Sequence, residues 1–192
     1  MRGDKAYDQG RSIYDVRPAQ GDEGSPHVAG TSGSLPCTGG SPYQHLNWRL
    51  GPKTRRKIRA HWALFSKLWD NFEQVADACI AAGGQVANEW PRACMYWRRR
   101  KVQRAMLRWG LKCYPVDGCM YGLVSSKRST QGQLLKKPWT IASTIGEFSS
   151  LRTCDGTHRH VPVEGSDTRM TEGYTDLLVD AIHGCWQRQC AQ

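Results

Sequence analysis

The sequence contains no uninterrupted apolar stretch that approaches the roughly 18 residues of a membrane-spanning helix. It also lacks a secretory signal, because Met1 is followed by Arg2, Asp4 and Lys5 and not by an apolar run. These absences argue against a membrane partner and favour an intracellular location. Without a signal, the eight cysteines are better interpreted as intracellular thiols than as a disulfide framework.

Internal repeats are absent as well, and the length of 192 residues is that of one domain with or without a tail. With 39% hydrophobic residues and eight tryptophans, the chain can bury a core. Glycine, aspartate, glutamine and arginine dominate residues 1–25, for which we predict a flexible N-terminal segment. Residues 26–192 are predicted to form a single α/β domain.

The net charge of +10 is concentrated in two short clusters. Such clusters favour a polyanionic partner, and nucleic acid is the one they fit best, which makes the nucleus the compartment to expect. The alternative is that each cluster is a solvated helix face. The residues predicted to bind nucleic acid are Arg55, Arg56 and Lys57 in the first cluster and Arg98, Arg99, Arg100 and Lys101 in the second.

Hydrophobic periodicity predicts strands that alternate with helices. Leu64, Leu68, Phe72, Val75 and Cys79 recur at three- and four-residue steps, which predicts an amphipathic helix of about 20 residues from residue 58. This alternation is typical of a Rossmann-like, mostly parallel sheet with flanking helices. The other expected elements are strands at 85–91, 112–119 and 137–144 and helices at 94–109 and 174–186. In the first helix, an adjoining apolar line is formed by Phe65, Trp69, Ala76 and Ile80, and Gly83-Gly84 should end the helix. In the helix at 94–109, the residues expected to face inward are Val102, Ala105, Met106 and Trp109, and Gly110 should end the helix.

Ligands of parallel α/β sheets collect beyond the carboxyl ends of the strands. Cys37, Glu89 and the segment 117–122 fall at such ends, so the topology directs Cys37 and Glu89 toward one crevice. Cys37 follows Pro36 and precedes two glycines, a setting that exposes a thiol. The alternatives are an ordinary thiol in a glycine loop and, for Glu89, an exposed carboxylate at a strand end.

The stretches "LPCTGGS", "LFSKLWDNFEQVADACIAAGGQVANEWP" and "VDGCMYGL…KKPWTIAST" together resemble the middle of the DNA (cytosine-5) methyltransferase catalytic domain over residues 28–145. The chain is similar in particular to divergent, truncated members found beside retroelements in aquatic eukaryotes. It departs from the family pattern in two places. Glu89 is followed by Trp90-Pro91 in place of Asn-Val, and Lys136-Lys137 replace the glutamine-and-arginine motif after the Tyr-Gly turn.

The resemblance implies that Cys37 is a nucleophile that adds to C6 of cytosine and that Glu89 is the acid at N3. The target base would leave the duplex to be reached. Lys136 or Lys137 could hold phosphate.

The family binds S-adenosylmethionine at a glycine-rich loop well upstream of its Pro-Cys loop. Only 35 residues precede Pro36, and they contain no strand followed by Gly-x-Gly and a helix. We therefore expect a C-terminal half of the fold that binds S-adenosylmethionine only if another segment or a second chain completes it, and that is otherwise inactive.

A separate motif, "CDGTHRH", places Cys154, His158 and His160 at a C-x3-H-x-H spacing, and Cys119 could be a fourth ligand. Thiolate and imidazole are the preferred ligands of zinc. The alternative is a polar loop with hydrogen-bonded histidines. Three functions therefore remain: a methyltransferase-like fragment, a basic nucleic-acid-binding module, and a zinc-stabilised structural domain of a mobile-element protein.

Overall fold

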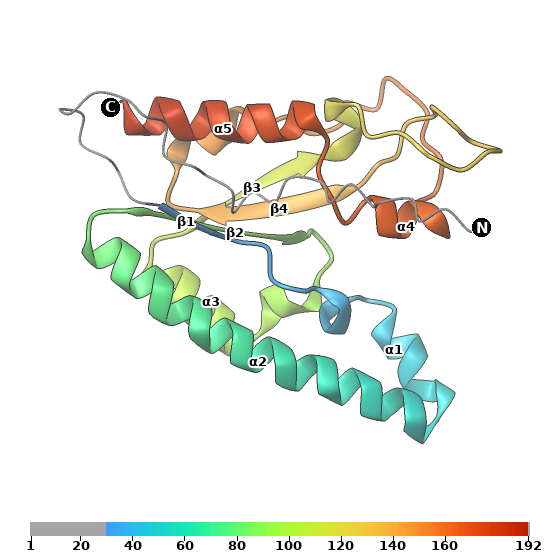
Figure 1. The fold of residues 1–192 in the computed structure, drawn as a ribbon, viewed down its shortest axis with the longest axis horizontal. Helices are drawn as coiled ribbons and strands as arrows, with labels where there is room; N and C mark the ends of the chain where they lie inside the picture. The colour runs from blue at the N-terminus through green and yellow to red at the C-terminus, as the bar shows by residue number, and fades with distance from the viewer. Residues whose placement is uncertain (1–29, 192) are drawn as a thin grey trace, which may run out of the picture.

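The computed structural model describes residues 30–191, so the predicted flexible segment 1–25 lies outside the described residues. The described chain is a mixed α/β fold in three layers (Figure 1). A central four-stranded sheet is covered on one face by α2 and α3 and on the other by α5. The strands are β1 (Gly30–Gly33), β2 (Gln85–Pro91), β3 (Lys112–Asp117) and β4 (Pro138–Ser143); the α-helices are α1 (Gln44–Asn47), α2 (Pro52–Ala81), α3 (Arg100–Arg108), α4 (Ser166–Met170) and α5 (Asp176–Cys190).

The sheet is mixed, which corrects the expectation of a mostly parallel sheet. Its order is β1-β2-β4-β3; only β1 and β2 pair in parallel, and β4 is antiparallel to both of its neighbours. The reason lies in the connection from β3 to β4. It contains no helix that crosses the sheet, and it folds back on itself through the bridge between Val124 and Leu134. β4 therefore begins at the edge where β3 ended and runs in the opposite direction.

Helix α2 begins at Pro52, six residues earlier than predicted, and ends before Gly83 as expected. Proline suits the first position of a helix because its missing N–H would have no partner there. The buried stripe is Phe65, Trp69, Phe72 and Ala76, whereas Leu64 and Val75 are about half exposed. The helix therefore buries the adjoining line of the predicted pattern, which carries Phe65, Trp69 and Ala76, together with Phe72.

The predicted basic helix at 94–109 divides into two parts. Residues Met95–Arg98 form the short helix η3, Arg99 is extended, and only α3 is regular. Val102, Ala105 and Trp109 are buried as predicted, and Gly110 ends the helix with a positive φ of 66°. Among residues 30–191, none of the helices combines the length and apolar character needed to cross a lipid bilayer.

Candidate functional site

Three sequence segments meet at one end of the sheet, where the carboxyl ends of β1 and β2 lie. β1 and β2 are parallel, so both end there, and the chain leaving β1 reaches Cys37 at the start of the short helix η1 (Thr38–Gly40). β4 begins at the same end because it is antiparallel, which brings in Lys137. This end of the sheet therefore gathers a thiol, the carboxyl group of Glu89 and an ammonium group.

Cys37 caps the first turn of η1, and its carbonyl oxygen accepts a hydrogen bond from the Gly40 N–H at 2.8 Å. The side chain is half-buried and packs beside the core cluster between α2 and the sheet. Burial raises the pKa of the thiol above its ordinary value of 9.0, the charge of Glu89 raises it further, and Lys137 lowers it. Cys37 is therefore coupled electrostatically to both Glu89 and Lys137.

Glu89 lies on β2 with its carboxyl group largely removed from water. Oε2 accepts a hydrogen bond from the Tyr174 hydroxyl, whereas Oε1 is buried and has no hydrogen-bond partner among the described residues. Burial raises the pKa of Glu89 from 4.5 to about 7, with Tyr174 and Lys137 opposing that shift. A carboxyl group with this pKa is half-protonated at neutral pH and can donate a proton from Oε1.

The raised pKa has a consequence for stability. A carboxyl group whose folded-state pKa lies above its unfolded value stabilises the fold at low pH and loses that contribution as pH rises through the folded pKa. Here the loss runs from about pH 4.5 to about pH 7. We compare the free energy of unfolding of Glu89→Gln with that of the wild-type chain. Between pH 4.5 and pH 8, we expect this difference to shift by about 2–3 kcal/mol in favour of the variant. Urea unfolding at the two pH values measures this, and an equal difference at both would show that Glu89 titrates normally.

A second group of side chains lies beyond the end of β3, where Cys119 meets the loop at 154–160. The ligand atoms of Cys119, Cys154, His158 and His160 all lie within 4.8 Å of one another. The Cys154 Sγ is 3.7 Å from His158 Nε2 and 3.5 Å from His160 Nε2. A tetrahedral zinc ion with ligands at about 2.0–2.3 Å separates them by roughly 3.3–3.8 Å. The geometry therefore matches a metal centre with two sulfur and two nitrogen ligands.

Asp117, at the end of β3, fixes the loop that carries most of these ligands. The side chain is buried; one carboxylate oxygen accepts from the Cys154 N–H at 2.9 Å, and the other pairs with Arg92 at 3.0 Å. The charge of Lys136 lowers the pKa of both Cys119 and His160, whereas the charge of Lys137 lowers the pKa of Cys37 and Glu89. The two adjacent lysines thus act electrostatically on different groups.

The basic residues predicted to bind nucleic acid differ in their surroundings. Lys101 is half-buried; it pairs with Asp70 at 2.6 Å and donates to the Ser66 carbonyl oxygen, so it joins α3 to α2. Lys137 is half-buried near Thr171, with 3.5 Å between Nζ and Oγ1. The exposed residues are Arg55, Arg56, Lys57, Arg98, Arg99, Arg100 and Lys136.

Sequence reasoning missed Tyr174. It is separated from Glu89 by 85 residues, and it was predicted only as the start of the last helix. Nothing in the residues around it signals a contact with a carboxyl group on a distant strand. Asp117 belongs to the segment 117–122 that was singled out at a strand end, but its contacts with Cys154 and Arg92 were not predicted.

Comparisons of the chain with family models, with curated proteins and with solved structures returned no match. The chemistry of the two sites is therefore argued from the residues and their geometry.

Proposed function

We propose that this chain acts on cytosine bases of nucleic acid through Cys37 and Glu89, as a divergent relative of the DNA (cytosine-5) methyltransferases with a Rossmann-like arrangement of β1, α2 and β2. The observation that carries the proposal is the pairing of a half-buried thiol with a carboxyl group that has one buried, unpartnered oxygen. An oxygen of that kind suits a ligand that completes its hydrogen bonding.

Cys37 and Glu89 together could catalyse exchange of the hydrogen at C5 of cytosine. The Cys37 thiolate adds to C6 of cytosine, and the electron pair of the C5–C6 double bond shifts while N3 takes the proton of Glu89. The enamine formed in this way is nucleophilic at C5. If it takes a proton from solvent there, N3 returns its proton to Glu89, the original C5 proton leaves, and the S–C6 bond breaks. Lys137 stabilises the thiolate during this cycle, since its charge lowers the pKa of Cys37.

S-adenosylmethionine would supply the methyl group in the family that the chain resembles. Among the described residues, β1 is an edge strand and leads directly to Cys37, and no strand followed by a glycine-rich loop and a helix stands beside it. The described residues do not form a site for this cofactor. A second chain or segment could add strands to the open edge of β1.

The proposal is tested by exchange of the cytosine C5 hydrogen in deuterated water, which needs no methyl donor. The reactive form has a Cys37 thiolate and a protonated Glu89 at the same time. We therefore expect the rate to rise about tenfold per pH unit up to about pH 7, and then to stay level until Cys37 itself titrates. Mass spectrometry of an oligonucleotide with one cytosine measures the exchange. Absence of exchange at every pH would refute the proposal.

The Cys/His group favours a second, compatible function, a structural zinc centre. Its four ligand atoms have the identities of a closed zinc site, and the two distances from the Cys154 Sγ to the histidine nitrogens fit one. Such a centre would hold the loop at 154–160 against the ends of β3 and η4 (Gly118–Tyr121), where Cys119 lies. The expected role is stabilisation of the end of the sheet that carries Cys37 and Glu89.

A further inference from the structure

The two basic clusters of the sequence meet around a pair of tryptophans. Trp48 and Trp62 are stacked, with ring centroids 5.5 Å apart and an interplanar angle of 17°. The guanidinium groups of Arg55 and Arg59 lie 5.7 and 5.5 Å from the centroid of Trp48. Arg99, from the second cluster, lies 5.3 Å from the centroid of Trp62. Aromatic and cationic groups from distant segments thus form one surface.

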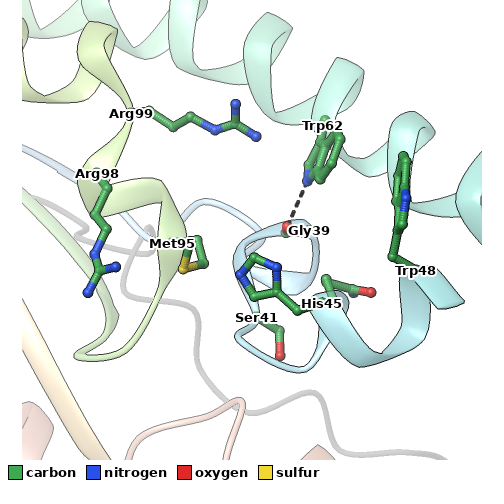
Figure 2. Close-up of a pocket in the computed structure, with 9 residues that line it drawn as sticks. Gly39, Ser41, His45, Trp48, Trp62, Met95, Arg98 and Arg99 are labelled. Carbon is green, nitrogen blue, oxygen red and sulfur yellow. Dashed lines mark hydrogen bonds between the residues drawn. The ribbon is translucent and has the colours of Figure 1, made fainter.

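A groove of about 390 Å³ opens between this tryptophan pair and the segment before α3. Figure 2 shows Arg99 extended toward Trp62, with Arg98, Met95 and His45 around the same space. The groove combines mainly apolar walls with two arginines, and no acidic residue lines it. Its volume lies in the range of small-molecule sites, which is roughly 300–1,000 Å³.

The groove is joined directly to the Cys37 loop. The Trp62 Nε1–H donates to the Gly39 carbonyl oxygen at 2.9 Å, and the next residue, Gly40, donates to the carbonyl oxygen of Cys37. Gly39 and Ser41 line the groove itself. Cys37 and the residues that line the groove are thus only a few positions apart in the chain. A nucleic-acid strand with one base at Cys37 could therefore place its next nucleotide in the groove.

Among the described residues, neither of the two arginines that line this groove forms an ion pair. No acidic residue occurs in the sequence between Glu23 and Asp70. Carboxylates of α2 appear only in its second half, where they pair with α3 through Lys101–Asp70 and Arg108–Glu73. The first half of α2 thus carries positive charge, and its second half carries the carboxylates. The positive end, near Trp48 and Trp62, suits an anionic partner.

We propose that this groove, which we call the Trp62 groove, binds a nucleotide next to the base at Cys37 and that the substrate is therefore single-stranded nucleic acid. The proposal rests on the proposed function for the position of the neighbouring base. A base in a single strand exposes its flat faces to aromatic and guanidinium groups, whereas a duplex hides them within the stack. The arginines at the rim would contact the flanking phosphates.

The test is binding of a fluorescein-labelled 12-nucleotide single strand with one central cytosine, compared with the same sequence as a duplex. We expect the full chain to bind the single strand about tenfold more tightly than the duplex, and Trp48→Ala to weaken single-strand binding about tenfold. Replacing Arg98 and Arg99 with glutamine should weaken binding and reduce the salt slope by about 1.4, since each lost phosphate contact contributes about 0.7. DNA and RNA versions of the strand show which sugar is preferred.

Arg128→Gln is the matched control for the single substitution Arg99→Gln, because each removes one positive charge and Arg128 is exposed outside the groove. Equal or tighter binding of the duplex, or equal losses from Arg128→Gln and Arg99→Gln, would overturn the proposal. Circular dichroism of each variant establishes that the fold is intact. The binding measurement needs no chemistry at Cys37. If the chain prefers the single strand but does not exchange the cytosine hydrogen, the proposed function is refuted and the proposal that the groove binds single strands stands.

Discussion

Cys154→Ser should remove a bound zinc ion and much of the stability of the chain. We expect the purified wild-type protein to contain one zinc ion per chain, because two thiols and two imidazoles lie at distances that match a tetrahedral site. In the variant, three ligands remain, and the zinc content should fall to a small fraction. Elemental analysis of freshly purified protein measures both.

The loss of stability follows from what the metal would join. The loop at 154–160 is otherwise attached to the domain through the hydrogen bond from Cys154 N–H to Asp117 and the bridge between Val161 and Leu135. Binding of a structural zinc ion supplies about 10–16 kcal/mol in peptides that fold only with metal. In a domain with its own core we expect a smaller loss of about 3–5 kcal/mol, which lowers the Tm by about 10 °C or more.

Cys113→Ser is the control for this substitution. Cys113 is exposed on β3, away from the cluster, and its substitution makes the same chemical change from thiol to hydroxyl. The Cys113→Ser variant should bind as much zinc as the wild-type protein, and its Tm should lie within a few degrees of the wild-type value. Wild-type protein that contains no metal, and whose Tm does not respond to a chelator, would contradict the zinc centre.

Cys37→Ser should abolish exchange of the cytosine C5 hydrogen. A hydroxyl group is far less acidic than a thiol, and the addition to C6 requires the deprotonated nucleophile. The raised pKa of Cys37 already leaves little thiolate at neutral pH, so a serine at this position has no useful anionic form. We expect the rate to fall to that of the uncatalysed reaction.

Binding should survive the same substitution, because the loop at Cys37 is set by the backbone hydrogen bond to Gly40 and by Trp62, not by the sulfur. Single-strand affinity within twofold of the wild-type value would establish that the variant is folded. Cys113→Ser serves again as the control, and it should exchange the hydrogen at the wild-type rate. Exchange by Cys37→Ser at the parental rate would mean that Cys37 takes no part.

The sequence predicted β2, β3, β4, α2, α5 and part of the helical region around α3, because the signals of these elements are local. Gly83 and Gly110 ended helices as expected, and the strand at 85–91 has the predicted bounds. The direction of β4 was wrong, because an alternation of strands and helices does not reveal that the segment between β3 and β4 stays at one edge. The start of α2 was also wrong, since Pro52 marks it and the apolar pattern begins later.

The site was predictable in part for the same reason. Parallel strands end at a common end of the sheet, so Cys37 and Glu89 could be assigned to that end from their positions alone, whereas a shared crevice stays a prediction. Tyr174 and the pairing of Trp48 with Trp62 could not, because those contacts depend on how separate helices pack. Lys137 reaches the site only because β4 is antiparallel, a feature that the sequence did not indicate.

The most direct test of the account is the covalent state of Cys37 after incubation with a single strand that contains 5-azacytosine. In this base a ring nitrogen replaces C5 and makes C6 more electrophilic, so the adduct with a thiol can be captured. The account predicts one oligonucleotide per chain, mapped by peptide mass spectrometry to Cys37 and absent in Cys37→Ser. No adduct, or an adduct on another of the eight cysteines, would contradict the central claim that Cys37 attacks a base.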